Sequence, residues 1–188
     1  MTPRTTAFRV FPWDAAADDG QPFSPAYTPP NLGRGRFDRP GTTPPTLYVA
    51  ETPEHAVAEQ LQAFRGRRLR PGQLKRSGHP LAISAVAFVG AVWDGLADLC
   101  DPSTLLDLGT RPDLTASADR RTTQAIAARA ATLNHSGVRW WSFYSGDWHT
   151  IALFSELLTT PPVYGTPEPL TPAHPAVIAA ADSLGISL

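Results

Sequence analysis

The stretch GRGRFDRPGTTPPTLYVAETPEHAVAEQL, residues 33–61, joins a glycine-rich turn, a short apolar run and the start of a helix. Within it, TLYVA at 46–50 is rich in residues that favour strands. The run predicts a half-buried strand with Leu47 and Val49 on one face and Tyr48 and Ala50 on the other. Tyr48 then has two interpretations, core packing for a second layer or a stacking surface for an aromatic ligand.

The residues after this strand carry the start signals of a helix. Thr52 is a suitable N-cap and Pro53 fits the first helical position, so the helix should run to about residue 65. On a helical wheel, Glu59 lies opposite the apolar stripe, which is formed by Val57, Leu61 and Phe64. His55, one turn earlier, could share the face of Glu59. This pattern fits a solvated glutamate as well as one that lines a ligand site.

Outward from this stretch, the chain alternates predicted strands and helices. The expected elements are a strand at 7–10, a Gly/Pro/Asp-rich connection at 14–46, a largely apolar central strand from 81 to between 90 and 95, helical turns around Pro102, a helix at 118–133, strands in 137–146 and 149–157, and a short helix at 173–184. Ile126, Ala130 and Leu133 should share a face, with Gly137 just past the helix end. We expect one domain over 1–158 and a Pro-rich tail, 159–188, that wraps the surface of the same unit.

The composition excludes several classes of function. A net charge of -1 and a pI near 6.5 provide no basic field to attract nucleic acid. Cys100 is the single cysteine, so it cannot form an internal disulfide, and it is expected to be a buried structural thiol. The sequence contains no spacing typical of zinc ligands. The N-terminus lacks a signal-peptide core and no window approaches the ~20 apolar residues of a membrane span. A cytoplasmic protein without direct nucleic-acid or membrane contact is therefore expected.

Two further stretches hold candidate site residues. Arg36 lies between Gly35 and Phe37. Its guanidinium could bind a phosphate or carboxylate through two hydrogen bonds, or it could simply face solvent. No phosphate-binding glycine motif is present, so phosphate binding would have to come from side chains. The aromatic-rich segment WWSFYSGDWH, 140–149, contains Ser142. Ser142, Asp147 and His149 could suggest a Ser-His-Asp hydrolase. No nucleophile-elbow sequence G-x-S-x-G occurs, and residues this close in sequence seldom form a catalytic triad, so a hydrolase of this kind is not expected.

The order of these pieces resembles the RES domain family, named for an arginine, a glutamate and a serine. GRFDRPG, LYVAE and AVAEQL look like its N-terminal pattern, and TTQAIAARAATL, GVRWWS and IALF look like its C-terminal pattern. The resemblance covers about residues 8–155. The family's functional positions are matched by Arg36, Tyr48, Glu59 and Ser142. Glu59 is preferred over Glu51 because it falls within the helix, whereas Arg34 competes with Arg36 for the arginine position.

The resemblance implies an α+β fold like that of the ADP-ribosyltransferases, with two small mixed or antiparallel sheets that form a cleft flanked by helices. It also implies an enzyme that cleaves the nicotinamide–ribose bond of NAD by phosphorolysis or hydrolysis, with no resident cofactor and no metal. Many members are growth-inhibiting toxins, so an Xre-like antitoxin that covers the active site is implied. In this scheme Arg36 holds the phosphates, Tyr48 stacks on or positions the ligand, Glu59 stabilises the ribose cation, and Ser142 hydrogen-bonds the ligand.

Two other functions stay open from the sequence. A protein ADP-ribosyltransferase would use the same residues but would transfer the ADP-ribose group of NAD to a protein target. A catalytically silent module would bind a nucleotide or a partner protein without turnover. The oligomeric state, either a homo-oligomer or a complex with an antitoxin, is equally open.

Overall fold

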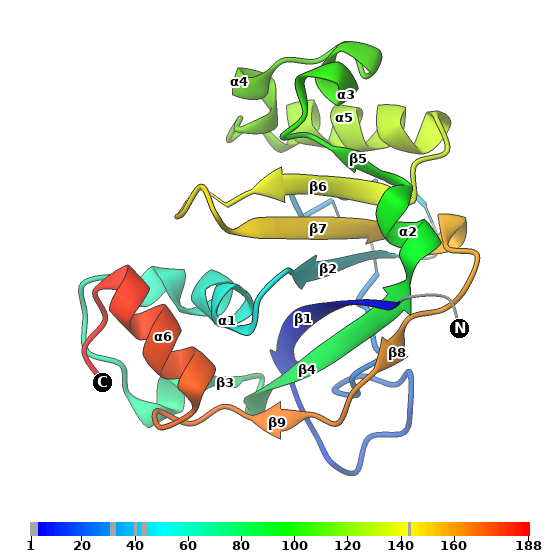
Figure 1. Ribbon diagram of the computed structural model, residues 1–188. Helices are drawn as coiled ribbons and strands as arrows, with labels where there is room; N and C mark the ends of the chain where they lie inside the picture. Colours follow the sequence, from blue (N-terminus) through cyan, green and yellow to red (C-terminus); the bar gives the residue numbers. More distant parts are fainter. Residues whose placement is uncertain (1–3, 31–32, 40, 43–44, 143) are drawn as a thin grey trace. The chain divides into compact units, whose positions relative to one another are not determined.

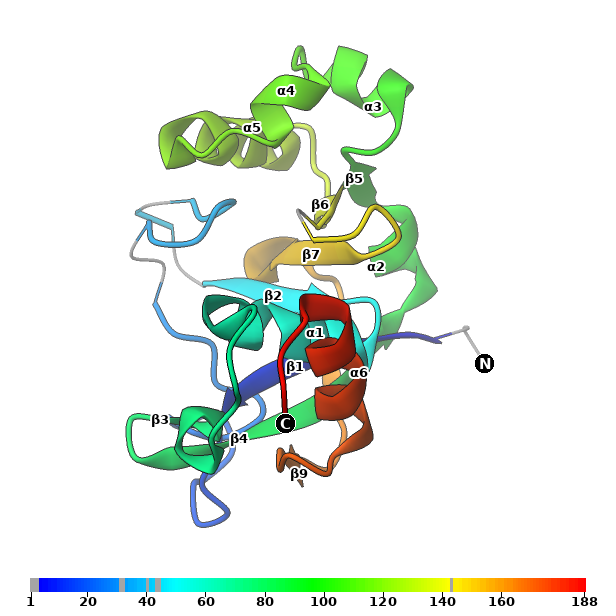
Figure 2. The same ribbon diagram turned by 90° about the vertical axis from the view of Figure 1, so that its left-hand side faces the viewer.

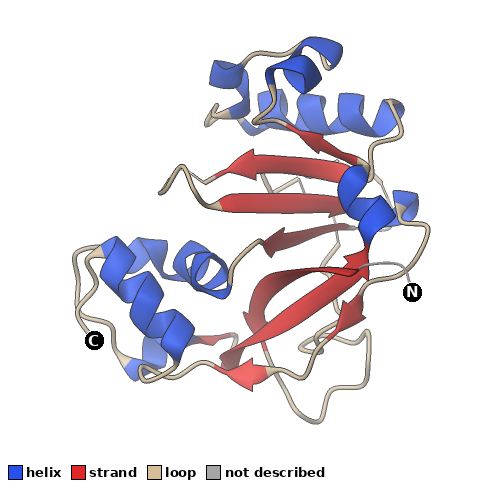
Figure 3. Cartoon of the chain, in the orientation of Figure 1, coloured by secondary structure: helices blue, strands red, loops and turns tan. Residues whose placement is uncertain are grey.

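The computed structural model describes residues 4–30, 33–39, 41–42, 45–142 and 144–188. The chain contains both strands and helices, with runs of each in succession, so the fold is mixed α+β (Figures 1 and 3). The contacts divide it into two compact units, each built from segments that are distant in the sequence. The first unit contains Thr28–Val49 and Phe88–Pro162 with the N-terminal end, and the second contains Thr6–Tyr27, Ala50–Ala87 and Val163–Leu188. The predicted division at residue 158 stays a prediction.

In the first unit, the strands lie side by side in the order β2 (Thr46–Ala50), β7 (His149–Phe154), β6 (Gly137–Trp141) and β5 (Leu96–Asp98). Strand β6 is antiparallel to β7 and parallel to β5. The helical elements are α2 (Gly90–Asp94), α3 (Pro102–Asp107), α4 (Pro112–Thr115), α5 (Arg120–Thr132) and the 3-10 turn η3 (Ser155–Leu157). Helices α3, α4 and α5 gather beside β5 (Figures 1 and 2).

An apolar core joins the strands and helices of the first unit. Its buried members are Phe37, Ala97, Leu99, Leu105, Leu108, Ile126, Ala127, Ala130, Val138, Ala152 and Phe154. Phe37 comes from the glycine-rich turn, and its ring centroid lies 4.4 Å from that of Trp140 on β6. Because this ring is buried in the core, the turn that carries Arg36 is anchored to the body of the unit.

In the second unit, β4 (His79–Val89) lies between β3 (Lys75–Arg76) and β1 (Arg4–Pro12), which confirms its prediction as a central strand. The short strands β8 (Val163–Tyr164) and β9 (Glu168–Pro169) also pair antiparallel with β4. Phe8 of β1 lies opposite Ala50 at the end of β2. The helices are α1 (Pro53–Leu61) and α6 (Pro175–Leu184), which pack against each other (Figure 2), and the 3-10 turns are η1 (Gln62–Phe64) and η2 (Pro71–Leu74).

The predicted strand and helix start in the opening stretch are confirmed. Strand β2 spans Thr46–Ala50, and Thr52 caps α1 by accepting a hydrogen bond from the His55 N–H at 3.3 Å. The helix ends earlier than predicted, at Leu61, and a 3-10 turn continues it to Phe64. The half-buried character predicted for β2 is wrong. Ala50, on the supposed open face, is 3% exposed, so both faces of the strand are covered.

Two predictions at the end of the second long helix are wrong. Leu133 is 40% exposed and does not join the apolar face of Ile126 and Ala130. Helix α5 ends at Thr132, and the left-handed residue beyond it is Asn134, with a φ of 62°. Gly137 instead opens β6, where a Cβ would lie 2.3 Å from the Ala152 carbonyl oxygen. Glycine is therefore needed there for close strand contact rather than for ending a helix.

The C-terminal tail does not simply wrap the surface, contrary to the sequence prediction. Helix α6 buries one face, formed by Ala176, Val177, Ala180, Ala181 and Leu184. This face packs in the second unit because small alanine side chains let α1 and α6 approach closely. Gly185, at a φ of 64°, ends the helix in the left-handed conformation. Among the described residues, no helix has the length and apolar character needed to span a membrane.

Candidate functional site

The glycine-rich turn of the first unit closes on Gly35. The Gly35 N–H donates to Asp38 Oδ2 at 2.8 Å, and the Asp38 N–H donates back to the Gly35 carbonyl at 3.3 Å. A Cβ at Gly35 would lie 2.3 Å from Asp38 Oδ1 and 2.4 Å from Tyr48 Oη. Since hydrogen bonds hold both of those side chains, the position accepts glycine alone.

Tyr48 locks the same turn through its hydroxyl group. Its Oη donates to Asp38 Oδ1 at 2.9 Å and accepts from the Phe37 N–H at 2.9 Å. Burial, followed by the charge of Asp38, raises the pKa of Tyr48 well above its usual range. The ring lies edge-on to Trp140, with 6.3 Å between the centroids. The hydroxyl therefore stays protonated at neutral pH, and these contacts commit it to holding the turn.

The three arginines of the turn have different environments. Arg34 is exposed. Arg39 is buried, with its guanidinium 4.3 Å from the centre of the Phe154 ring and paired with Glu156. Arg36 lies between these extremes, because it is half-buried. Of the three, Arg36 alone combines partial exposure with a fixed position on the turn.

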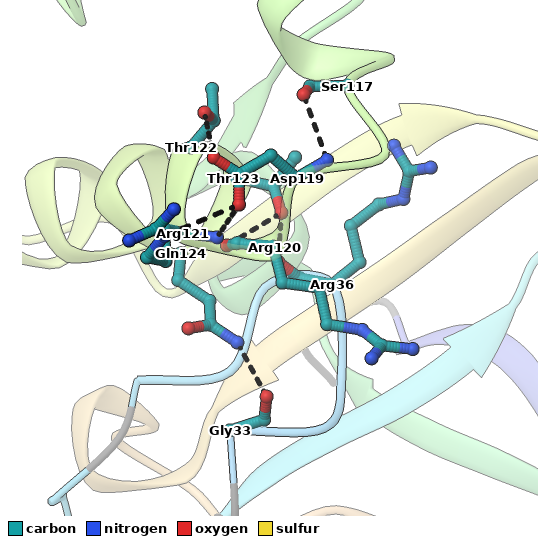
Figure 4. Close-up of polar contacts among 9 residues, drawn as sticks. All are labelled: Gly33, Arg36, Ser117, Asp119, Arg120, Arg121, Thr122, Thr123 and Gln124. Carbon is teal, nitrogen blue, oxygen red and sulfur yellow. Dashed lines mark hydrogen bonds and ion pairs between the residues drawn. The ribbon is translucent and has the colours of Figure 1, made fainter.

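Arg36 is tied to the helical part of the first unit. Its Nη1 donates to the Thr115 carbonyl at 3.0 Å. Its own carbonyl accepts from Thr123 Oγ1 on α5 (Figure 4). Gln124 Nε2 donates to the carbonyls of Gly33 at 2.9 Å and Gly35 at 3.1 Å. A guanidinium has five N–H donors. Within the described part of the chain one of them is used, so the remaining donors of Arg36 can hold an anionic ligand.

Ser142 directly follows β6 and is 4% exposed. Its N–H donates to the Trp148 carbonyl at 2.6 Å, and its Oγ accepts from the Tyr144 N–H at 3.3 Å. His149 starts β7 opposite Trp141. Ser142 is thus a buried residue directly after the end of a strand.

Glu59 lies on α1 in the second unit. Its Oε1 is 3.0 Å from Nε2 of His55, one turn earlier on the same face. The His55 side chain is 0% exposed, whereas that of Glu59 is 33% exposed. The predicted shared face is therefore confirmed. The contact with this buried imidazole restrains the rotation of the Glu59 carboxylate.

The structure brings Arg36 and Tyr48 together, because both are fixed by the same turn. Ser142 belongs to the same unit, and Glu59 belongs to the second unit. Sequence reasoning missed Asp38, which links Gly35 to Tyr48. An Asp side chain can hydrogen-bond the backbone three residues before it, so the Gly-x-x-Asp spacing was the available signal. In the described ranges, no group of three or more His, Cys, Asp or Glu residues could hold a metal ion.

Comparison with known proteins gives this site a family. The model of the RES domain family matches residues 8–172. The chain belongs to the RES domain family. Among solved structures, this RES domain is similar to a chain in the crystal structure of the M. tuberculosis MbcT–MbcA toxin–antitoxin complex. The TM-score is 0.58 at 18% identity, over 92% of this chain and 87% of that chain, so the likeness shows the fold. No curated protein matches the chain.

The RES domain match contains every candidate site residue and extends beyond residue 158. It therefore includes β8 and β9, which complete the pairing of β4 in the second unit. The turn with Arg36, the strand with Tyr48 and the helix with Glu59 follow one another in the order expected of a RES domain. Pro40, in the segment GRFDRPG that resembles the family's N-terminal pattern, lies outside the described residues.

Proposed function

We propose that this RES domain is an NAD-degrading enzyme that cleaves the nicotinamide–ribose bond, with phosphate or water as the acceptor. The observation that carries the proposal is the locked turn. Asp38 and Tyr48 hold the backbone on both sides of Arg36, and the guanidinium keeps most of its donors for a ligand. A guanidinium fixed in this way suits the diphosphate of a dinucleotide, which presents several oxygens to a planar fork of donors.

The proposed reaction needs a carboxylate near the ribose. When the bond between C1″ and the nicotinamide nitrogen breaks, the electron pair leaves with nicotinamide, which departs as a neutral molecule. The ribose acquires oxocarbenium character, and a nearby carboxylate lowers the energy of that charge. An oxygen of phosphate or water then bonds to C1″, and water releases one proton to solvent. We assign Glu59 to stabilising the cation and orienting the acceptor.

The other candidate residues have supporting roles in this proposal. Arg36 binds the diphosphate, and Tyr48 positions the turn from which Arg36 projects. The buried hydroxyl of Ser142 supplies a hydrogen bond to the ligand. His55 restrains the Glu59 carboxylate through the 3.0 Å contact. An ADP-ribosyltransferase-like fold is part of the proposal.

We further propose that the protein is the toxin of a toxin–antitoxin pair and acts in the cytoplasm. Membership of the RES domain family supports this. The structurally similar MbcT chain comes from a complex described as toxin–antitoxin, which also supports it. The proposed partner is an Xre-like antitoxin that covers the active site. Expression without such a partner should arrest growth, and Glu59→Gln should relieve the arrest.

The direct test is incubation of the purified protein with NAD, with and without inorganic phosphate. Mass spectrometry should detect nicotinamide together with ADP-ribose or its 1″-phosphate. Glu59→Gln should lower the rate by roughly 100-fold or more, as expected when a group that stabilises transition-state charge is removed. Glu54→Gln, on the first turn of the same helix, is the matched control and should keep the native rate.

The products also discriminate the alternative functions. Labelled ADP-ribose on a protein, in place of small products, would identify a protein ADP-ribosyltransferase. Binding of NAD without nicotinamide release would identify a silent binding module. Native-rate NAD consumption by Glu59→Gln would refute the role of this carboxylate.

A further inference from the structure

The first unit contains a second arginine close to Arg36 that the family pattern does not identify. Arg120 is the first residue of α5, directly after the N-cap Asp119. The Oγ1 of the buried Thr123 contacts the carbonyl of Arg36 and lies 3.2 Å from the carbonyl of Arg120. One hydroxyl therefore joins the turn to the start of the helix, and the two arginine backbones meet at it.

The two arginine side chains point the same way. Figure 4 shows the guanidinium groups of Arg36 and Arg120 extended to one side of the turn, while Arg121 extends to the opposite side. The charge of Arg120 also acts on the Tyr48 hydroxyl, where it opposes the rise in the Tyr48 pKa. Arg120 thus reaches toward the same locked turn that holds Arg36.

The acidic residues around this pair are already engaged. Asp38 accepts from Gly35 and Tyr48, and Asp119 accepts from the N–H of Arg121 in capping the helix. Across the described residues, neither Arg36 nor Arg120 has a carboxylate within ion-pair distance. Two guanidinium charges on one side, at the positive end of a 13-residue helix, favour an anion between them.

We propose that Arg36 and Arg120 together form a binding site for phosphoryl oxygens, with Arg120 as its second cation. The site rests on the proposed function in that its ligand is either the diphosphate of NAD or the inorganic phosphate acceptor. Both ligands present the same chemistry, because each offers several anionic oxygens to the two guanidinium groups. Arg120 is exposed, so it closes over the ligand from the solvent side while Arg36 holds it from the turn.

The test uses calorimetric binding of ADP-ribose and, separately, of inorganic phosphate to the full chain carrying Glu59→Gln. The added variants are Arg120→Gln, Arg120→Lys and the neighbour Arg121→Gln as a matched control. Arg121 is 94% exposed and 3.7 Å from Asp119, so its loss should change neither affinity. Arg120→Gln should weaken binding by about 10- to 100-fold, and Arg120→Lys by less, because the charge remains without the fork.

Weaker binding of ADP-ribose alone assigns the site to the diphosphate, weaker binding of phosphate alone assigns it to the acceptor, and either supports the site. Equal affinities in Arg120→Gln and Arg121→Gln would overturn it, as would failure of both probes to bind the parent protein. Because binding is measured without turnover, the anion site can stand even if the wild-type protein does not consume NAD. Matching thermal melting curves would verify that the Arg120 variants remain folded.

Discussion

Gly35→Ala offers a sharp test of the locked turn, since the added methyl group has no room. Its Cβ would lie 2.3 Å from Asp38 Oδ1, 2.4 Å from Tyr48 Oη and 2.8 Å from Tyr48 Cζ. Overpacking of this kind costs about 1–3 kcal/mol. Separating Asp38 from Tyr48 also leaves buried polar groups without hydrogen-bond partners, which costs about 1–3 kcal/mol of stability for each group. A loss of about 3 kcal/mol is expected, or roughly 6–12 °C in melting temperature for a chain of this size.

The assay is thermal unfolding followed by circular dichroism, with Gly72→Ala as the matched control. A Cβ at Gly72 meets nothing within 4 Å, so that variant should melt within about 2 °C of the wild type. Tyr48→Phe removes one of the clashing atoms, so Gly35→Ala should cost less in the Tyr48→Phe background than in the wild type. The reasoning is refuted if Gly35→Ala melts like the control, or if the two substitutions are strictly additive.

Three other predictions test different parts of the molecule. His55→Gln should reduce NAD consumption by roughly 10-fold through looser placement of Glu59, and an unchanged kcat in steady-state kinetics would contradict that positioning role. Burial raises the pKa of Cys100 to about 11, so iodoacetamide should alkylate this thiol at pH 8 roughly 100-fold more slowly than a free thiol. The alkylation rate should rise as the pH approaches 11. Fast labelling at pH 8 would contradict the raised pKa. Because the folded thiol binds its proton more tightly than the unfolded one, its contribution to stability is complete below about pH 8.5 and is lost as pH rises toward 11. Leu105→Ala should lower the free energy of unfolding, measured by urea titration, by about 2–4 kcal/mol. Leu106→Ala, at the 80% exposed neighbouring position, should change that free energy by less than about 0.5 kcal/mol. Equal losses in the two variants would contradict the assignment of Leu105 to the core.

The sequence by itself determined the local elements and the family. Strand β2 and the start of α1 were predictable because strand alternation and an N-cap depend on residues only a few positions apart. The pairing of His55 with Glu59 follows from helical spacing in the same way. The end of α5 was not predictable, because Asn134 took the left-handed position that the sequence pattern assigned to Gly137.

Only the tertiary structure decided how the candidate residues are held. Thr123 contacts the carbonyl of Arg36, 87 positions away, and the tail helix α6 became part of a buried core. Arg120 and Arg121 are adjacent and identical in type, yet they point to opposite sides and have different neighbours (Figure 4). Such contacts join segments that are distant along the chain, so they depend on how the elements pack rather than on any local pattern of residues.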